Sequence, residues 1–263
     1  MRNAASKLMA PTIFACLIFA PVRIAAQGHE GRLRHIAARL DVNVAEFDKG
    51  EFSLSETLES LEKLINDSSE TGKQAQKKVA IRLRYASFPD NTFVRGPENS
   101  RIRFRTKWED VPIRTILHSI CKTLDAGYIV RNDGIEIVST KTLQEELELP
   151  QTSKSDLRSL VVQFYDQAPL REALTDLALK YNRTVLLSPR AEKQLEQKVT
   201  ARLLNLPFPA AVATLAELAD LKVVQKSNVF LITPKDHAKE LNDELDKRKK
   251  TDPPPRIRAL AIE

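Results

Sequence analysis

The fold is decided by residues 157–234, which read LRSLVVQFYDQAPLREALTDLALKYNRTVLLSPRAEKQLEQKVTARLLNLPFPAAVATLAELADLKVVQKSNVFLITP. Alternating or short apolar runs in this stretch predict strands at 160–165, 184–188, 198–206, 221–226 and 229–233. Pro169 and Pro207 each stand just before an apolar stripe with helical spacing, which predicts two helices, over 169–181 and 207–220. The expected order is strand, helix, strand, strand, helix, strand, strand.

Residues 40–140 repeat this order less clearly. Strands are predicted at 41–47, 79–85 and 101–107, and a hairpin at 128–138, whose Asp-Gly turn accepts positive φ angles. Ser53 and Glu56 have the spacing of a capping box at the start of one helix, and Pro112 opens the other. One repeated unit explains the length of the chain better than one large domain does. We therefore predict an α+β protein of two tandem small domains, each β-α-β-β-α-β-β with two helices against small mixed sheets.

The predicted domain boundaries follow from these units. The first domain covers residues 40–140 and the second covers 158–234, with a linker over 141–157. Residues 28–40 form a polar lead-in without a strong pattern, and the turn residues of 89–100 predict a loop. A charged helical tail follows over 235–263 and is interrupted by three consecutive prolines.

Residues 1–26 have the form of a secretory signal peptide. Arg2 and Lys7 precede a mostly apolar run, and a small residue, Ala26, stands before the expected cut. The run is shorter than the roughly 18–20 residues of a membrane span, which disfavours an uncleaved anchor. Lipoprotein cleavage before Cys16 is a further alternative, although Phe14 fits it poorly. The expectation is a periplasmic or otherwise exported protein with no transmembrane segment after cleavage.

The composition limits the chemistry that the chain can perform. The chain has 263 residues, a net charge of +6 and two cysteines, so cleavage after Ala26 leaves Cys121 as a single thiol. Cys121 falls on the apolar stripe of its helix and is expected to be buried, whereas His118 is expected on the polar face. No histidines or cysteines have metal-ligand spacing, and no nucleophile stands beside a base. We predict no enzyme activity, no cofactor and no metal.

The second unit resembles a known family. Residues 164–181 (FYDQAPLREALTDLALKY), 184–189 (TVLLSP) and 199–219 (VTARLLNLPFPAAVATLAELA), with the closing hairpin, are similar to the short N-terminal domain of secretins and TonB-dependent receptors, the STN domain. Residues 40–140 share the likeness only in element order and in their second half. The resemblance implies a periplasmic unit in which two helices pack with a two-stranded and a three-stranded sheet and make protein contacts. The residues after Pro234 are too few for a pore or barrel, so it implies an isolated, duplicated interaction module.

Basic residues on two predicted strands support an alternative function. If the strands share a sheet, one face binds an anionic surface or polymer, such as lipid or polysaccharide. Nucleic acid is a weaker version, because export removes most encounters with it. A solvated outer face whose charges prevent strand pairing is the plainer interpretation. The residues of this predicted face are Arg82, Arg84, Arg101, Arg103, Arg105 and Lys107.

Two classes of function therefore remain. The favoured one is an adaptor that contacts an envelope protein through the second domain's hairpin or an exposed sheet edge. The alternative is a binder of anionic surfaces or polymers that uses the basic face of the first domain.

Overall fold

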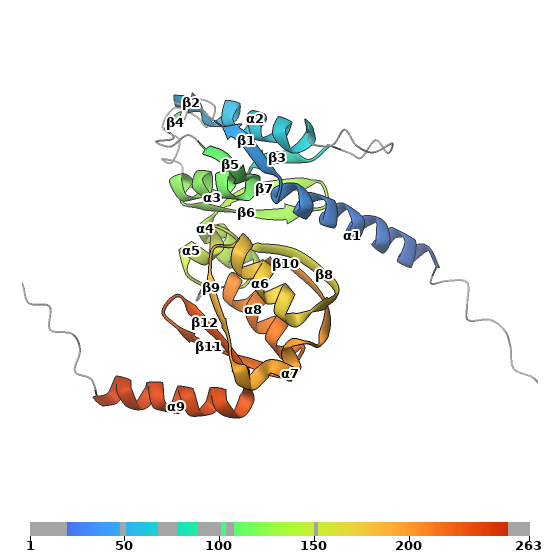
Figure 1. Ribbon diagram of the computed structural model, residues 1–263. Coiled ribbons are helices and arrows are strands. Elements are labelled where there is room, and N and C mark those ends of the chain that lie inside the picture. Colours follow the sequence, from blue (N-terminus) through green and yellow to red (C-terminus); the bar gives the residue numbers. More distant parts are fainter. Residues whose placement is uncertain are drawn as a thin grey trace, which may run out of the picture.

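The computed structural model describes residues 20–47, 51–67, 78–88, 101–103, 108–149 and 152–251. Helices and several small sheets are both present, so the predicted α+β class is confirmed. The elements gather in two groups, one above the other in Figure 1. We call residues 20–139 the first half, 140–157 the connector and 158–251 the second half.

The second half contains a two-stranded and a three-stranded sheet. In the smaller sheet, β8 (Val161–Pro169) pairs antiparallel with β10 (Lys198–Leu206). In the larger sheet, β12 (Val229–Pro234) lies between β11 (Leu221–Lys226), which is antiparallel to it, and β9 (Thr184–Leu187), which is parallel. Helices α6 (Leu170–Lys180) and α8 (Phe208–Glu217) share one apolar core with both sheets. The predicted order is present, with η3 (Pro189–Ala191) and α7 (Glu192–Leu195) added between β9 and β10.

The described part of the first half has the same pairing pattern. Strand β1 (Asn43–Phe47) pairs antiparallel with β5 (Trp108–Pro112), and β7 (Gly134–Ser139) lies between β6 (Ala126–Arg131) and β3 (Ala80–Leu83). The strand that comes first in the sequence is parallel to the central strand of the larger sheet in both halves: β3 to β7 here, and β9 to β12 in the second half. The helices are α2 (Leu54–Asp67) and α3 (Ile113–Leu124), and η1 (Tyr85–Ser87) follows β3. An added pair, β2 (Glu51–Ser53) with β4 (Arg101–Arg103), has no counterpart among the described residues of the second half.

The strand predicted at 101–107 is placed differently in the structure. Its first residues form β4 and pair with β2, whereas the partner of β1 is β5, which begins at Trp108. The reason is apolar pairing: Trp108 lies opposite Phe47, with ring centroids 6.1 Å apart, and Val111 lies opposite Val44. The predicted loop 89–100 lies outside the described residues.

The predicted capping box is confirmed at the start of α2. The backbone N–H of Ser53 donates to a carboxylate oxygen of Glu56 over 3.0 Å, and the N–H of Glu56 donates to Ser53 Oγ over 3.3 Å. These bonds satisfy amides that the first turn of a helix leaves without partners. The helix then buries the expected face against the core through Leu54, Leu58, Leu61 and Ile65.

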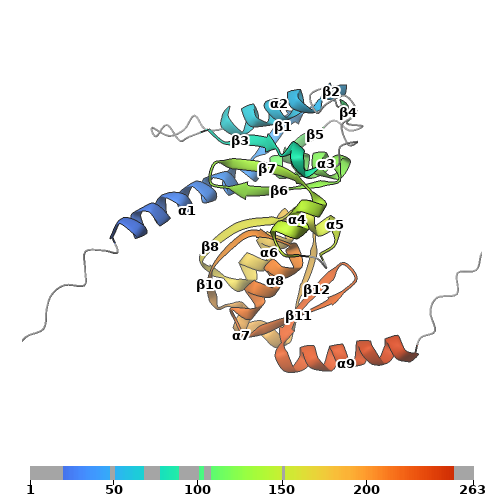
Figure 2. The same cartoon turned by 180° about the vertical axis from the view of Figure 1, so that it is seen from behind.

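The polar lead-in predicted for 28–40 is wrong, because these residues form the last turns of helix α1 (Ala20–Leu40). Its buried residues follow helical spacing: Leu33, Ile36, Ala37 and Leu40. The helix packs on α3 and β6 of the first half and on β8 of the second, where the Arg34 guanidinium lies 5.1 Å from the centre of the Phe164 ring. Figure 2 shows α1 running out past both halves.

The signal peptide and its cleavage remain predictions. Residues 1–19 lie outside the described residues, and the expected cut after Ala26 falls within α1. Within the described ranges, no helix combines the length and the apolar character needed to cross a bilayer.

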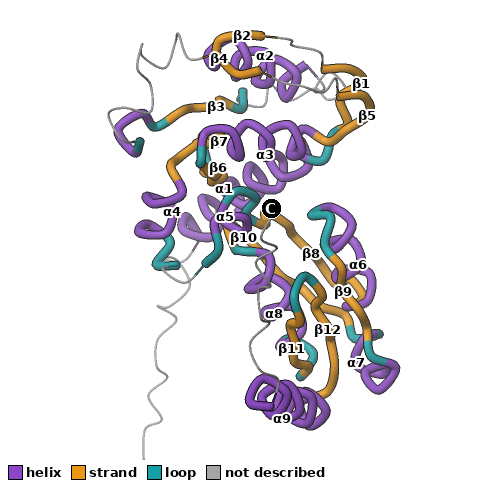
Figure 3. Tube along the Cα trace, turned by 90° about the vertical axis from the view of Figure 1, so that its left-hand side faces the viewer, coloured by secondary structure: helices purple, strands orange, loops and turns teal. Residues whose placement is uncertain are grey.

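The connector is folded against the first half, so the predicted linker 141–157 is not a loose tether. It forms α4 (Thr140–Glu146) and α5 (Lys154–Leu157), which Figure 3 shows beside β6 and β7. Leu143, Leu157 and Leu160 pack against the outer face of this sheet, on Ile129 and Val138. The spacing of Leu143 and Leu147 predicts a short helix before Pro150, which agrees with α4, whereas Leu157 carries no such signal.

Two polar contacts fix the junction between the halves. The side-chain amide of Asn205 in β10 accepts from the backbone N–H of Val130 over 2.8 Å and donates to its carbonyl over 2.9 Å, at the edge of β6. Asp41, which follows α1, accepts hydrogen bonds from Arg114 of α3 and lies 3.0 Å from the ammonium group of Lys180 in α6. The junction is therefore held by directed hydrogen bonds and ion pairs.

Cys121 is fully buried on the apolar face of α3, as predicted. Burial raises the pKa of its thiol to about 12. With Cys16 changed to serine, we expect Ellman's reagent at pH 8 to modify the folded protein at least about 100-fold more slowly than the protein in guanidinium, since thiolate is the reactive form. Rapid modification of the folded protein would show that α3 is open to solvent.

Candidate functional site

The strands of the predicted basic face do not share one sheet in the described part of the chain. Arg82 and Arg84 belong to β3 and its end, whereas Arg101 and Arg103 belong to β4, and these strands lie in different sheets. The premise of a shared sheet is therefore wrong, because β4 pairs with the inserted strand β2. Arg105 and Lys107 lie outside the described residues.

Arg82 and Arg84 are also paired with carboxylates. Arg82 forms an ion pair with Asp133, and Arg84 donates to both oxygens of Glu136 over 2.8 and 2.7 Å and also contacts Glu146. The hydrogen bonds to Arg84 lower the pKa of Glu136, so this carboxylate stays charged at neutral pH. These residues, with Arg131, form an ionic cluster on the outer face of the sheet β3–β7–β6.

The same place in the second half is apolar. Strand pairing aligns Leu186 of β9 with Leu231 of β12, and Leu231 with Val224 of β11. Together with nearby side chains these residues line a hollow of about 340 Å³ on the outer face of the sheet. We call it the apolar groove; its lining residues are Leu186, Val224, Lys226, Val229, Leu231, Leu241 and Glu244.

The two outer faces can be compared position by position. In the strand register of the first half, Arg82 of β3 lies opposite Glu136 of β7. The corresponding positions in the second half are Leu186 of β9 and Leu231 of β12. Helix α4 follows β7 directly and brings Glu146 to the ionic cluster. Helix α9 (Lys235–Thr251) follows β12 directly and brings Leu241 to the groove. A salt-bridged surface in one half is thus replaced by leucines in the other.

The apolar groove is only partly covered. Ala238 of α9 is buried over one end of the sheet, beside buried Thr233, but Leu186 at the other end is 51% exposed. In the first half the connector leucines Leu143 and Leu157 cover the corresponding sheet. In the second half α9 lines one side of the groove through Leu241 and Glu244 and then runs on past the sheet (Figure 1), and residues 252–263 lie outside the described residues. A concave surface lined by several apolar side chains is typical of a binding site.

Sequence reasoning missed the groove, although a signal was present. TVLL at 184–187 and VFLI at 229–232 are continuous apolar runs and do not alternate with polar residues. Continuous runs are typical of strands that are covered on both faces. In this structure the inward face is covered by the core, and the outward face lines the groove.

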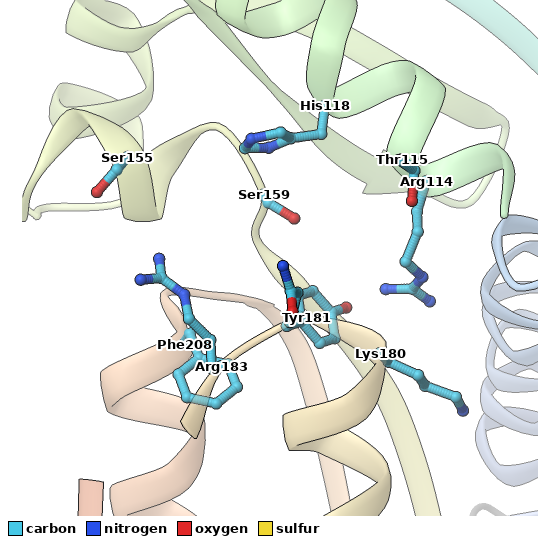
Figure 4. Close-up of a pocket in the computed structure, with 10 residues that line it drawn as sticks. Arg114, Thr115, His118, Ser155, Ser159, Lys180, Tyr181, Arg183 and Phe208 are labelled. Atoms are coloured by element: carbon cyan, nitrogen blue, oxygen red, sulfur yellow. The ribbon is translucent and has the colours of Figure 1, made fainter. Parts of the chain in front are cut away.

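A second hollow, of about 320 Å³, lies between the halves. Figure 4 shows Arg114, Thr115 and His118 of α3 on one side of it and Tyr181, Arg183 and Phe208 on the other. We call it the junction cavity; its remaining lining residues are Ser155, Ser159, Lys180 and Asn182.

His118 lies on the same side of α3 as Arg114 and Thr115, but this side is not open to solvent. It is half-buried and faces the junction cavity, because the second half packs over this side of α3. Burial, and then the charges of Arg158 and Lys122, lower the pKa of His118, so the imidazole is neutral at pH 7. Its Nδ1 atom is buried and has no hydrogen-bond partner in the part of the chain that the structure describes.

Comparison with family models and with curated proteins gives no match for this chain. Across the described ranges, no group of histidine, cysteine and carboxylate side chains is arranged to hold a metal ion.

Proposed function

We propose that this protein is a non-catalytic exported adaptor that binds an envelope protein through the apolar groove. The proposal is carried by one observation: where the first half has Arg82 opposite Glu136, the equivalent positions of the second half have Leu186 opposite Leu231. Charged residues at these positions are stable in contact with water, whereas covering exposed leucines with another apolar surface lowers the free energy.

We further propose that each half is an STN-like domain. The pairing pattern supports this, since each half joins a two-stranded sheet, a three-stranded sheet with one parallel pair, and two helices. In the family that the second half resembles, such domains make protein contacts in the periplasm, which agrees with a docking function. Export and the identity of the partner rest on the sequence alone.

The first half indicates the chemistry of the partner. There, Ile129 and Val138 on the outer face of the three-stranded sheet are covered by short helices that present Leu143 and Leu157. We propose that a short amphipathic helix of the partner, with leucine-like residues on one face, covers the apolar groove in the same manner. Lys226 and Glu244 at the groove provide one charge of each sign to orient it.

The alternative, binding of an anionic surface or polymer through the strand face, has lost its main support. Arg82 and Arg84 are paired with carboxylates, and they are not in the sheet that contains Arg101 and Arg103. Anion binding by that face therefore has to compete with the existing ion pairs.

Leu186→Asp is expected to abolish partner binding without unfolding the protein. The side chain is half exposed, so the change costs little stability, but a bound partner would have to desolvate the new carboxylate. We expect the dissociation constant for a peptide that corresponds to the partner's helix to rise at least about tenfold. The matched control is Arg82→Asp, the equivalent position of the first half, which should leave binding unchanged.

The partner can be identified by site-specific photo-crosslinking in native cells. A benzophenone amino acid at Leu186 should capture one defined envelope protein, and the crosslink should disappear when Leu231→Glu is added. The same probe at Arg82 should not capture it. Equal crosslinking from both positions, or capture only of a second copy of this chain, would refute the proposed adaptor function.

A further inference from the structure

The junction cavity carries an inference that is independent of the apolar groove. The groove lies on the outer face of the second half beside α9, whereas the cavity lies where α3 faces the end of α6 (Figure 4). A variant that disables one can therefore leave the other intact.

The cavity presents cations to its interior and keeps its carboxylates outside. Arg114, Lys180 and Arg183 line it, and none of the lining residues that the structure describes is acidic. Each of these cations forms an ion pair with a carboxylate that does not line the cavity. Arg114 pairs with Asp41, and Arg183 pairs with Asp156. Lys180 pairs with Asp41 and Asp176. The carboxylates offset the charge of the cations, so a ligand would be selected mainly by directed hydrogen bonds.

Arg114 provides the most specific observation. Its side chain is only 4% exposed, and Asp41 accepts from its Nε and one terminal nitrogen. The other terminal nitrogen, Nη1, is buried and has no hydrogen-bond partner among the described residues. A buried guanidinium nitrogen with unused donors is costly, because it has lost water without gaining an acceptor. Its plane also lies against Tyr181, with the guanidinium carbon 4.7 Å from the ring centre. The donors are thereby held in place.

The other cavity walls complete a mixed set of polar and aromatic groups. Ser159 offers a hydroxyl, and Arg183 lies with its guanidinium carbon 5.8 Å from the centre of the Phe208 ring. The unpartnered Nδ1 of neutral His118 can accept a hydrogen bond from a ligand hydroxyl. Few precisely placed polar groups over an aromatic floor, in about 320 Å³, are typical of a small-molecule site.

We propose that the junction cavity binds a small phosphate monoester that also carries hydroxyl groups. Arg114 Nη1 donates to a phosphate oxygen, because planar guanidinium groups match phosphate geometry. Arg183, on the other side of Tyr181 (Figure 4), donates to a hydroxyl oxygen at the far end of the ligand. His118 accepts from a hydroxyl of the same ligand. A ligand held by α3 and by the loop after α6 contacts both halves and stabilises their junction.

Calorimetric titration of the full chain with glycerol 3-phosphate tests this proposal. Saturable binding is expected with glycerol 3-phosphate, weaker binding with inorganic phosphate, and none with glycerol. Arg114→Gln and Arg183→Gln should each raise the dissociation constant for glycerol 3-phosphate at least about tenfold, the usual effect of losing a charge-assisted hydrogen bond. Arg82→Gln, which removes an exposed arginine far from the cavity, should leave it unchanged.

Further variants and a lipid experiment make the result decisive. Because Arg114→Gln also removes the partner of Asp41, circular dichroism must show that it folds; Ser159→Leu, which fills the cavity, provides a second route to the same loss. Co-sedimentation with vesicles that contain phosphatidic acid, a lipid phosphate monoester, distinguishes a lipid headgroup from a soluble ester as the source of the phosphate. The proposal is overturned if glycerol 3-phosphate does not bind, or if the cavity variants bind it as tightly as Arg82→Gln does.

Discussion

Asp41→Ala is expected to lower the free energy of unfolding by about 3 kcal/mol, measured by urea denaturation followed by circular dichroism. Asp41 accepts from Arg114 Nε over 2.6 Å, and Arg114 is 4% exposed, so its removal leaves a buried guanidinium without a compensating charge. The carboxylate also contacts Lys180 and Gln163 of the second half over 3.0 and 3.3 Å. The loss therefore weakens the junction as well as α3.

The matched control for this variant is Asp133→Ala. Asp133 also pairs with an arginine, Arg82, but these side chains are 47% and 63% exposed. Exposed ion pairs contribute less than about 1 kcal/mol, because water screens them in the folded state. Equal destabilisation by the two variants would show that the Asp41–Arg114 pair is not a buried junction contact.

Gly127→Ala is expected to lower the free energy of unfolding by about 3 kcal/mol through a steric clash. A Cβ atom at Gly127 would lie 2.2 Å from the carbonyl oxygen of Leu157 and 2.5 Å from Leu143 Cδ1. The oxygen belongs to the backbone, so a rotamer change cannot relieve the contact, and the connector must move off the sheet. Trypsin should then cleave after Lys154 and Arg158 much faster than in the original protein.

Gly31→Ala serves as the control, because a Cβ atom there meets nothing within 4 Å on the exposed side of α1. Alanine in a helix is favoured over glycine by about 1 kcal/mol, so this variant should be more stable than the original protein. If Gly127→Ala were as stable as the original protein, the packing of the connector on the first sheet would be wrong.

Local sequence patterns predicted much of the fold. Three local signals predicted helices that are present in the structure. They are the capping box at Ser53, the prolines before α6 and α8, and the helical stripe that contains Cys121. The patterns failed where distant residues decide the outcome. Strand 101–103 alternates like a core strand, but only the partner of β1 shows that Trp108 begins the equivalent strand.

The candidate sites were harder to predict for the same reason. Whether Arg82 is an open cation depends on Asp133, which lies in a different part of the sequence. The residues that line the apolar groove come from three strands and a helix. Likewise, α1 carries a helical stripe that ends at Leu40, but its importance is visible only once it packs across both halves. The alternation of side chains along one strand is a local property, whereas the composition of a sheet's outer face depends on which strands pair.

The amide of Asn205 has a consequence beyond the junction that it fixes. It occupies both backbone hydrogen-bonding groups of Val130 at the edge of β6, as a neighbouring strand would. An open strand edge can recruit the edge of another molecule, and repeated recruitment leads to fibrous aggregates. The Asn205 side chain closes that position and cannot extend the ladder, so Val130 is not available to pair with a strand of another molecule.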